Sequence, residues 1–216
     1  MYRIEENGHT SLGMRRFLMM ENAGHGLADY IVSKFKGRIR NKKIVAVCGT
    51  GNNGGDGFVA SRHLAGYGAR ITIVLLGSPS DIKSEEAKLN WGIVEKMNSI
   101  EILFGRDVNT DIKSMISKAD IVLDAIFGTG IRGVIREPYA SAIDAINANR
   151  RGLVLAVDVP SGFDPNSGTI HDKCVKADAT ITFHRLKVGL ARGKRYTGPV
   201  HVEWIGIPPE AEEGVL

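Results

Sequence analysis

Short apolar runs that alternate with stretches of helical periodicity constrain this fold more than any other feature. Runs of strand character cover residues 43–48, 70–76, 100–104, 121–125, 153–158, 179–183 and 200–205. Between most of them the apolar residues recur at helical spacing, as in residues 58–65 and 139–146. Strands that are apolar throughout, joined by helices, predict a mainly parallel sheet covered by helices on both faces.

The two ends of the chain depart from this alternation. Residues 11–36 predict one long helix before the first strand, in which Gly24 and Gly26 mark the close approach of another backbone. The last two strands are joined by a loop of glycine, lysine and arginine, so we expect an antiparallel edge there. Because no linker or full repeat divides the chain, residues 1–216 are predicted to form a single domain.

Composition excludes several classes of protein. The chain is 43% hydrophobic with a net charge of +4, and its basic residues are scattered, which argues against nucleic-acid binding. No window is long and apolar enough to predict a membrane span. The two cysteines cannot form a disulfide framework, and the histidines show no paired spacing, so we expect a reduced cytoplasmic setting and no zinc or iron site.

A glycine-rich segment directly follows the first apolar run. Residues 49–57, GTGNNGGDG, contain five glycines and lead into a helical stretch. Because glycine has no Cβ and a helix start exposes N–H groups, we expect these glycines to make room for a phosphate-bearing ligand rather than to serve packing. The G-x-G-x-x-G spacing of Gly49, Gly51 and Gly54 is by itself only a weak indication of dinucleotide binding.

The same spacing recurs in residues 128–133, after another apolar run. Arg132 within it can pair with a phosphate through two hydrogen bonds. Two such loops at one edge of a sheet suit a ligand with a pyrophosphate or several phosphate groups. An ordinary glycine-rich connection is the alternative.

Two acids stand out at the ends of strands. Asp158 closes the run 153–158, so it faces the expected crevice as a candidate base or ribose clamp, with a turn cap as the alternative. Asp124 lies inside a buried run, where an ionised carboxylate needs a partner. No arginine or lysine follows it before Arg132, so we expect either a bound cation or a salt bridge from elsewhere in the chain.

Four segments together resemble a known family. These are MENAG (residues 20–24), NNGGDG (52–57), DAIFGTGIRG (124–133) and VDVPSG (157–162). They resemble the NAD(P)H-hydrate epimerase family, the YjeF N-terminal type of domain, in order and spacing. The resemblance runs over nearly the whole chain and is far more specific than a lone glycine motif.

The resemblance implies a three-layer α/β/α Rossmann-like fold. It implies epimerisation between the R and S forms of hydrated NADH and NADPH at carbon 6 of the nicotinamide ring, a repair of nicotinamide nucleotides. Asp158 would be the catalytic acid or base, with Arg132 as a helper. The implied substrate-binding residues are Asn52, Asn53, Gly54, Gly55, Asp56, Gly128, Thr129, Gly130, Ile131, Arg132, Gly133, Val134 and Asp158.

The resemblance also implies a cofactor and partners. One potassium ion per subunit would be held by the side chains of Asn53, Asp124 and Ser161. Members are usually homodimers and supply the S form to an ATP- or ADP-dependent dehydratase, which often follows in one longer chain. The choice between NADH and NADPH, and between water loss and ring opening as the route, stays open.

Two other functions remain alternatives. An NAD(P)-dependent oxidoreductase is disfavoured because Leu76-Gly77-Ser78 carries no acid for the ribose and no Tyr-x-x-x-Lys pair is present. A non-catalytic binding or scaffold module is disfavoured because the acids and cation ligands are all retained. The other marked residues are expected to be structural: a surface position for His184, Arg185 and Lys187, core or interface for Trp91 and Trp204, and support for Glu21 and Asn22.

Overall fold

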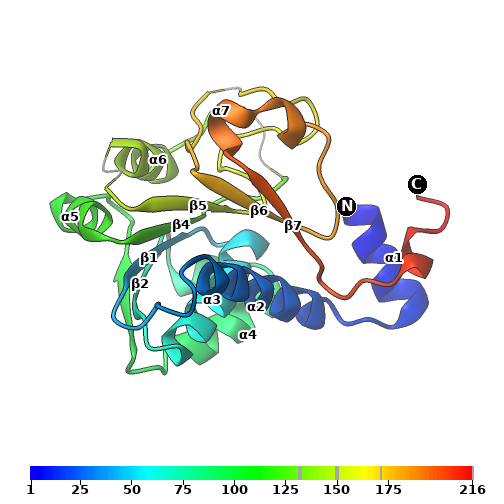
Figure 1. Ribbon diagram of the computed structural model, residues 1–216, viewed down its shortest axis with the longest axis horizontal. Coiled ribbons are helices and arrows are strands. Elements are labelled where there is room, and N and C mark those ends of the chain that lie inside the picture. The colour runs from blue at the N-terminus through cyan, green and yellow to red at the C-terminus, as the bar shows by residue number, and fades with distance from the viewer. Residues whose placement is uncertain (131–132, 149–150, 171, 216) are drawn as a thin grey trace.

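The computed structural model describes the chain except for residues 131–132, 149–150, 171 and 216. A seven-stranded sheet runs through the middle of the described part (Figure 1). Its strands are β1 (Lys43–Cys48), β2 (Arg70–Leu75), β3 (Ile100–Phe104), β4 (Ile121–Ala125), β5 (Leu153–Val157), β6 (Ala179–Phe183) and β7 (Val200–Glu203). Their order is β3-β2-β1-β4-β5-β6-β7, and all neighbouring strands pair in parallel, which confirms the predicted parallel sheet.

Helices cover both faces of this sheet. They are α1 (Tyr2–Leu12), α2 (Arg16–Lys34), α3 (Asn52–Gly66), α4 (Glu85–Val94), α5 (Thr110–Lys118), α6 (Tyr139–Ala148) and α7 (Lys194–Thr197). Figure 1 shows α2, α3 and α4 on one side of the sheet and α5 and α6 on the other. The three-layer α/β/α arrangement of the Rossmann type is therefore confirmed.

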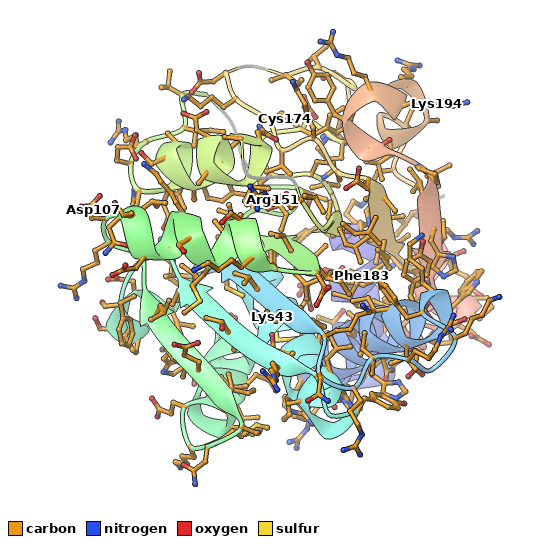
Figure 2. All side chains as sticks on the ribbon, turned by 60° about the vertical axis from the view of Figure 1, so that its left-hand side comes forward. Lys43, Asp107, Arg151, Cys174, Phe183 and Lys194 are labelled. Carbon is orange, nitrogen blue, oxygen red and sulfur yellow. The ribbon has the colours of Figure 1, made fainter. Side chains whose placement is uncertain are left out.

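Strand β1 shows why the apolar runs had to be buried on both sides. Ile44, Ala46 and Cys48 belong to the apolar core beneath α2, α3 and α4. Val45 and Val47 belong to the opposite core, beneath α5 and α6. Successive side chains of a strand point to opposite faces, so a strand between two helix layers must be apolar at every position. Side chains fill both of these layers (Figure 2).

The single helix predicted over residues 11–36 is wrong at its start. α1 ends before Gly13, which adopts the left-handed conformation with a φ of 67°, and the Met14 N–H donates to the Gly8 carbonyl at 3.0 Å. This arrangement terminates a helix, so the chain turns and α2 begins afresh at Arg16. The predicted close approach at Gly24 is confirmed, because a Cβ there would lie 2.4 Å from the Cβ of Val59 in α3.

The predicted antiparallel edge is also wrong. β6 and β7 pair in parallel, with Thr180 opposite Val200. The segment 184–199 contains the short helix η2 (Leu190–Arg192) and α7. It returns the chain to the end of the sheet at which the parallel strands begin. A connection of this length can make the crossover that a parallel pair requires.

The strand order reverses between β1 and β4. From β1 the chain proceeds outward to β2 and β3, and from β4 it proceeds the other way to β5, β6 and β7. In open α/β sheets ligands bind at the carboxyl ends of the strands beside such a reversal. Across the described ranges, no helix combines the length and the apolar character needed to cross a membrane.

Candidate active site

A cavity of about 650 Å³ opens at the carboxyl ends of the strands beside this reversal. The volume lies within the range of small-molecule sites. Of the residues predicted to bind substrate, Asn52, Asn53, Asp56, Gly128, Thr129, Gly130 and Asp158 line it. The two glycine-rich loops and the acid after β5 therefore meet at one place, as their positions after parallel strands predict.

Four of the remaining predicted residues lie elsewhere. Gly54 and Gly55 are buried in the first turn of α3 and do not line the cavity. Gly133 and Val134 also lie outside its lining, and the side chain of Val134 is 78% exposed. Ile131 and Arg132 fall outside the described residues.

The first glycine-rich segment does not serve the ligand alone. A Cβ on Gly49 would lie 2.2 Å from the carbonyl oxygen of Ile126, and one on Gly54 would lie 1.9 Å from the Gly49 oxygen. Gly55 and Gly57 are similarly crowded, by Met20 and by Ala125. The expectation that these glycines leave packing aside is therefore wrong, because most of them let the loop, α2 and β4 approach each other closely.

Other glycines do leave open space. A Cβ on Gly51, the residue that caps the start of α3, would meet no atom within 4 Å, and the same holds for Gly130 in the second loop. Both line the cavity. The start of α3 thus presents its first turn to open space, the arrangement that suits a phosphate group.

Asp158 directly follows β5 and adopts a left-handed conformation with a φ of 64°. Its Oδ1 accepts hydrogen bonds from the Thr182 hydroxyl at 3.1 Å, from the Phe183 N–H at 3.3 Å, and from the Lys187 ammonium. Lys187 also donates to the Thr182 hydroxyl oxygen at 2.8 Å and to the Phe183 carbonyl at 3.0 Å. Left-handed backbone at a residue other than glycine is strained, and here the ion pair and the end of β6 hold it in place.

These contacts leave one carboxylate oxygen available. All three donors reach Oδ1, and among the described residues Oδ2 accepts no hydrogen bond. Asp158 therefore offers a free, fixed carboxylate oxygen at the cavity, the geometry that a general base needs.

The position of Lys187 differs from the expectation. Its side chain is only 9% exposed and lines the cavity, so the expected surface location is wrong. Because Lys187 lies four residues beyond the end of β6, at the edge where the other strands also end, its position after a strand was the available signal.

Asp124, in β4, is completely buried. Its carboxylate accepts hydrogen bonds from the Ser161 N–H at 2.7 Å, from the Ser161 hydroxyl at 2.5 Å and from the Ile126 N–H at 3.4 Å. No ion pair reaches it within the described ranges, so the alternative of a salt bridge from elsewhere finds no support. Burial raises the pKa of Asp124 to about 6, although the hydrogen bonds from Ser161 and Ile126 lower it.

The three predicted potassium ligands come together around one stretch of backbone. The Ser161 hydroxyl accepts a hydrogen bond from the Phe127 N–H at 2.9 Å and lies 3.4 Å from the Phe127 carbonyl oxygen. A Cβ on the next residue, Gly128, would lie 3.6 Å from Oδ1 of Asn53. The side chain of Asn53 is buried, and its amide nitrogen has no hydrogen-bond partner among the residues that the structure describes.

This donor set fits a monovalent cation. It combines an amide, a carboxylate, a hydroxyl and a backbone carbonyl, which are the oxygen ligands that hard cations prefer. A buried carboxylate without a cationic partner is costly in an apolar interior, and a bound cation would offset that cost. The oxygens of Asn53, Asp124 and Ser161 could therefore hold a cation.

Several residues near the site have structural roles. Glu21 accepts hydrogen bonds from Arg62 and His63, and Asn22 donates to the Ile205 carbonyl, so the expected support from α2 is confirmed. Trp91 is buried in the core as expected, whereas Trp204 is 63% exposed.

His184 is the other departure from the expected surface positions. Its side chain is only 1% exposed and hydrogen-bonds to Glu212 at 2.7 Å. Burial lowers the pKa of His184, although the Glu212 carboxylate raises it. His184 thus joins the end of β6 to the C-terminal turn η3 (Pro209–Glu212) rather than facing the cavity. Arg185 is exposed as expected and pairs with the same carboxylate.

Further residues that no sequence motif indicated also line the cavity. Met1, Tyr2 and Glu5 reach the cavity from α1, and Lys83 reaches it from the segment before α4. No local pattern marks these residues, because their position depends on how α1 packs against other parts of the chain. Glu5 and Lys83 place charged side chains in a part of the cavity lining that lies outside the sequence motifs.

Comparison with known proteins identifies the family. The model of the family described as YjeF-related protein N-terminus matches residues 17–189. This chain belongs to that family. The matched segment contains both glycine-rich loops, Asp124, Asp158, Ser161 and Lys187, and it excludes α1.

Relatives with curated names cover the whole chain. A protein of Cenarchaeum symbiosum named NAD(P)H-hydrate epimerase is 50% identical over 216 residues, which are 100% of this chain and 97% of the relative. A protein of Nitrosopumilus maritimus with the same name is 49% identical over the same extents. A bifunctional NAD(P)H-hydrate repair enzyme Nnr of Pyrobaculum aerophilum is 42% identical over 98% of this chain, which spans 42% of that longer protein.

A solved structure shares the fold. The crystal structure of the yeast protein ynu0 superposes with a TM-score of 0.77 over 88% of this chain and 79% of the yeast chain, at 23% sequence identity. At this identity the likeness concerns the fold alone.

Proposed function

We propose that this chain is an isomerase that interconverts the R and S forms of hydrated NADH and NADPH at carbon 6 of the nicotinamide ring. The observation that carries the proposal is the full-length similarity, at 50% identity, to a protein named NAD(P)H-hydrate epimerase. The cavity supports it, because both glycine-rich loops and an oriented carboxylate face one space of ligand size.

The reaction needs little machinery. Carbon 6 of the hydrate bears a hydroxyl and the ring nitrogen, as in a hemiaminal. It can invert by losing and regaining water or by ring opening and closure, and neither route breaks a C–H bond or transfers electrons. A positioned acid or base contributes about 10²–10⁴-fold to such a step. We assign the base to Asp158, with Lys187 holding its Oδ1 so that Oδ2 can take a proton.

The dinucleotide would lie along the two loops. We assign its phosphate groups to the start of α3 and to the open backbone around Gly51 and Gly130. The assignment of Arg132 as a helper stays a proposal from the family resemblance. The crowded glycines of the first loop would keep this backbone rigid, so the loop is already shaped before the ligand arrives.

Potassium is part of the proposal. Asn53, Asp124 and Ser161, with the Phe127 carbonyl, would hold one ion per subunit. When bound, it would supply positive charge beside the pocket and would tie together the loops after β1, β4 and β5. Asp124 would then be an ionised ligand rather than a buried carboxylate without a cationic partner.

We further propose that the chain works with a dehydratase. Relatives named bifunctional NAD(P)H-hydrate repair enzymes support this coupling, because this chain matches less than half of their length. The enzyme would supply that partner with the S form. A homodimer in the cytoplasm completes the proposal and is checked by light scattering and by localisation of the tagged protein.

The direct test supplies the purified R hydrate of NADPH and follows its conversion to the S form by chromatography. Conversion well above the rate without protein is the expected result, and a rate equal to that background would overturn the proposal. Incubation of NADPH with carbonyl substrates distinguishes the oxidoreductase alternative, since loss of the reduced nicotinamide absorbance would support that alternative instead.

A further inference from the structure

The cavity presents two carboxyl groups besides Asp158. Glu5 enters from α1, and Asp56 enters from the first turns of α3. Across the part of the chain that the structure describes, no hydrogen bond or ion pair reaches either carboxyl. Asp158 differs sharply, because Lys187, Thr182 and Phe183 all donate to it.

The nearby cations are largely engaged with other carboxylates. Lys187 pairs with Asp158, and Arg16 pairs with Glu6. The charged groups that line the cavity from the surrounding elements are Glu5 and Arg16 near α1 and α2, Asp56 in α3, Lys83 and Glu86 at α4, Asp158 after β5 and Lys187 after β6. The described residues thus give Asp56 no cation of its own.

Negative charges in one cavity disfavour one another. Asp158 is the carboxyl whose charge the structure compensates, since the Lys187 ammonium and the Thr182 hydroxyl donate to it. Burial, and then the negative charges of Asp158 and Glu5, raise the pKa of Asp56 well above its usual range. Burial and the charge of Asp158 also raise the pKa of Glu5.

We propose that Asp56 carries a proton at neutral pH and donates it to the substrate, and that the carboxylate of Glu5 keeps this proton on Asp56. Asp56 is then the catalytic acid that works together with the base Asp158, while Glu5 is a positioning residue that acts through Asp56. Two carboxyls held in opposite protonation states are the arrangement that acid–base catalysis requires.

This assignment rests on the proposed function and balances in either route. With water loss, Asp56 gives its proton to the C6 hydroxyl, the C–O bond breaks, and the ring nitrogen's lone pair forms a C=N bond. Water then adds to the opposite face and gives a proton to Asp158. With ring opening, Asp158 takes the hydroxyl proton as the C=O bond forms, the C–N bond breaks, and Asp56 protonates the nitrogen. Solvent returns the proton from Asp158 to Asp56 after the first route, and reclosure returns both protons in the second.

Helix α1 is held firmly enough to place Glu5. Ile4 is 2% exposed, and the Asn7 amide donates to the Ala211 carbonyl at 3.2 Å. Arg3 donates to the Gly214 carbonyl at 3.2 Å. The C-terminal turn therefore clamps α1 beside the cavity, and this clamp supplies a residue from outside the segment that the family model matches.

Turnover gives the first test, with kcat and KM for the R hydrate of NADPH measured across pH. We expect Asp56→Asn to lose about 100-fold or more in kcat with KM changed less than about threefold. Glu5→Gln should keep most of the maximal kcat but move its alkaline limb to lower pH by about half a unit or more, because the charge that holds the proton on Asp56 is gone. Glu85→Gln, the same change on an exposed side chain of α4, should superpose on the wild type.

A readout without turnover separates this inference from the proposed function. Carboxyl carbon NMR of the full chain, assigned by comparison with Asp56→Asn, should show Asp56 titrating well above the usual aspartate value of about 3.9, and at lower pH in Glu5→Gln. An ordinary midpoint for Asp56, an Asp56→Asn variant with unchanged kcat, or a Glu5→Gln profile identical to the wild type would overturn the inference. If Asp56 of the wild type titrates at raised pH but the protein does not epimerise the hydrate, the catalytic role of Asp56 and the proposed function are both overturned. Only the protonation of Asp56 would then stand.

Discussion

At the scale of single residues, the site depends on where hydrogen bonds are absent as much as on where they form. Oδ1 of Asp158 receives three donors, and Oδ2 receives none among the described residues. A carboxylate with both oxygens occupied would be held but blocked. One occupied oxygen fixes the orientation while the other stays available for a proton.

Replacing Asp158 tests the base directly. Asp158→Asn keeps the size of the side chain and can still accept from Thr182 and Phe183, but it cannot take a proton. We expect epimerisation to fall by about 100-fold or more with the fold and dinucleotide binding largely intact, and the melting temperature to fall because Lys187 loses its carboxylate partner. The assay is chromatographic conversion of the R hydrate, and activity within about threefold of the wild type would remove Asp158 from this role.

Replacing Lys187 tests the orientation of that base. Lys187→Met keeps the length of the side chain but leaves Asp158 without its cation. We expect kcat to fall about tenfold or more with KM changed less than about threefold, because the carboxylate then loses the contact that fixes its orientation at the cavity. Lys176→Met, at an exposed position outside the cavity lining, is the control. An unchanged kcat in Lys187→Met would contradict the orienting role.

The sequence predicted the residues whose chemistry is local. Asp158 follows a strand and Asp124 interrupts one, so each shows its unusual environment in its own neighbourhood. Glu5 gives no such signal, because its place in the cavity arises from contacts between α1 and residues about two hundred positions away. Lys187 lies between these cases, since only its distance from a strand end marks it.

At the scale of elements, the contact between α2 and α3 positions the first glycine-rich loop. A Cβ on Gly24 would lie 2.4 Å from the Cβ of Val59 and 2.9 Å from the Ala60 nitrogen. The two helices therefore approach as closely as their backbones permit. Because α3 begins at the cavity, any displacement of this contact also moves Asn52, Asn53 and Asp56.

Two glycine substitutions measure this contact. Gly24→Ala should lower the stability by about 1–3 kcal/mol, since overpacking outweighs the gain of about 1 kcal/mol in helix propensity. Gly92→Ala is the matched control in α4, where a Cβ would meet no atom within 4 Å, and it should raise the stability by up to about 1 kcal/mol. Urea unfolding of both variants is the measurement. Equal stabilisation by both substitutions would show that Gly24 is not crowded.

Element boundaries illustrate what periodicity can and cannot supply. The runs 43–48, 100–104, 121–125 and 179–183 match the observed strands residue for residue. Burial on both faces leaves a clear apolar signature in the three inner strands among them, whereas only Ile100 is buried in β3 at the edge of the sheet. Strand direction has no such signature. The parallel pairing of β7 depends on the path of residues 184–199, which the composition of that segment did not reveal.

At the scale of the whole molecule, distant parts of the chain meet at the site. The two ends of the chain lie near each other (Figure 1), where α1 packs against the C-terminal turn η3. His184 ties the end of β6 to that same turn through Glu212. The part of the cavity lining that α1 contributes therefore depends on tertiary contacts that no single motif contains. The part at the carboxyl ends of the strands was predictable from the sequence.

The proposed cation gives a property of the whole fold that melting can measure. An ion that binds only the folded chain stabilises it by RT ln(1 + [L]/Kd), so potassium at about 100 times its Kd should raise the melting temperature by roughly 5–10 °C relative to choline at equal ionic strength. The ion would join loops from β1, β4 and β5, so its effect belongs to the cooperative unit rather than to one loop.

Removing the central ligand should abolish this dependence. Asp124→Ala deletes the buried carboxylate that Ser161 orients, and we expect its melting temperatures in potassium and choline to coincide. Asp144→Ala, which removes an exposed carboxylate from α6, should keep the potassium effect of the wild type and so controls for loss of charge. If Asp124→Ala folds poorly, Ser161→Ala gives a second measurement with the carboxylate retained. A wild type that melts at the same temperature in both salts would rule out potassium as a ligand of this cluster, and Asp124 would then have to be held by its hydrogen bonds alone.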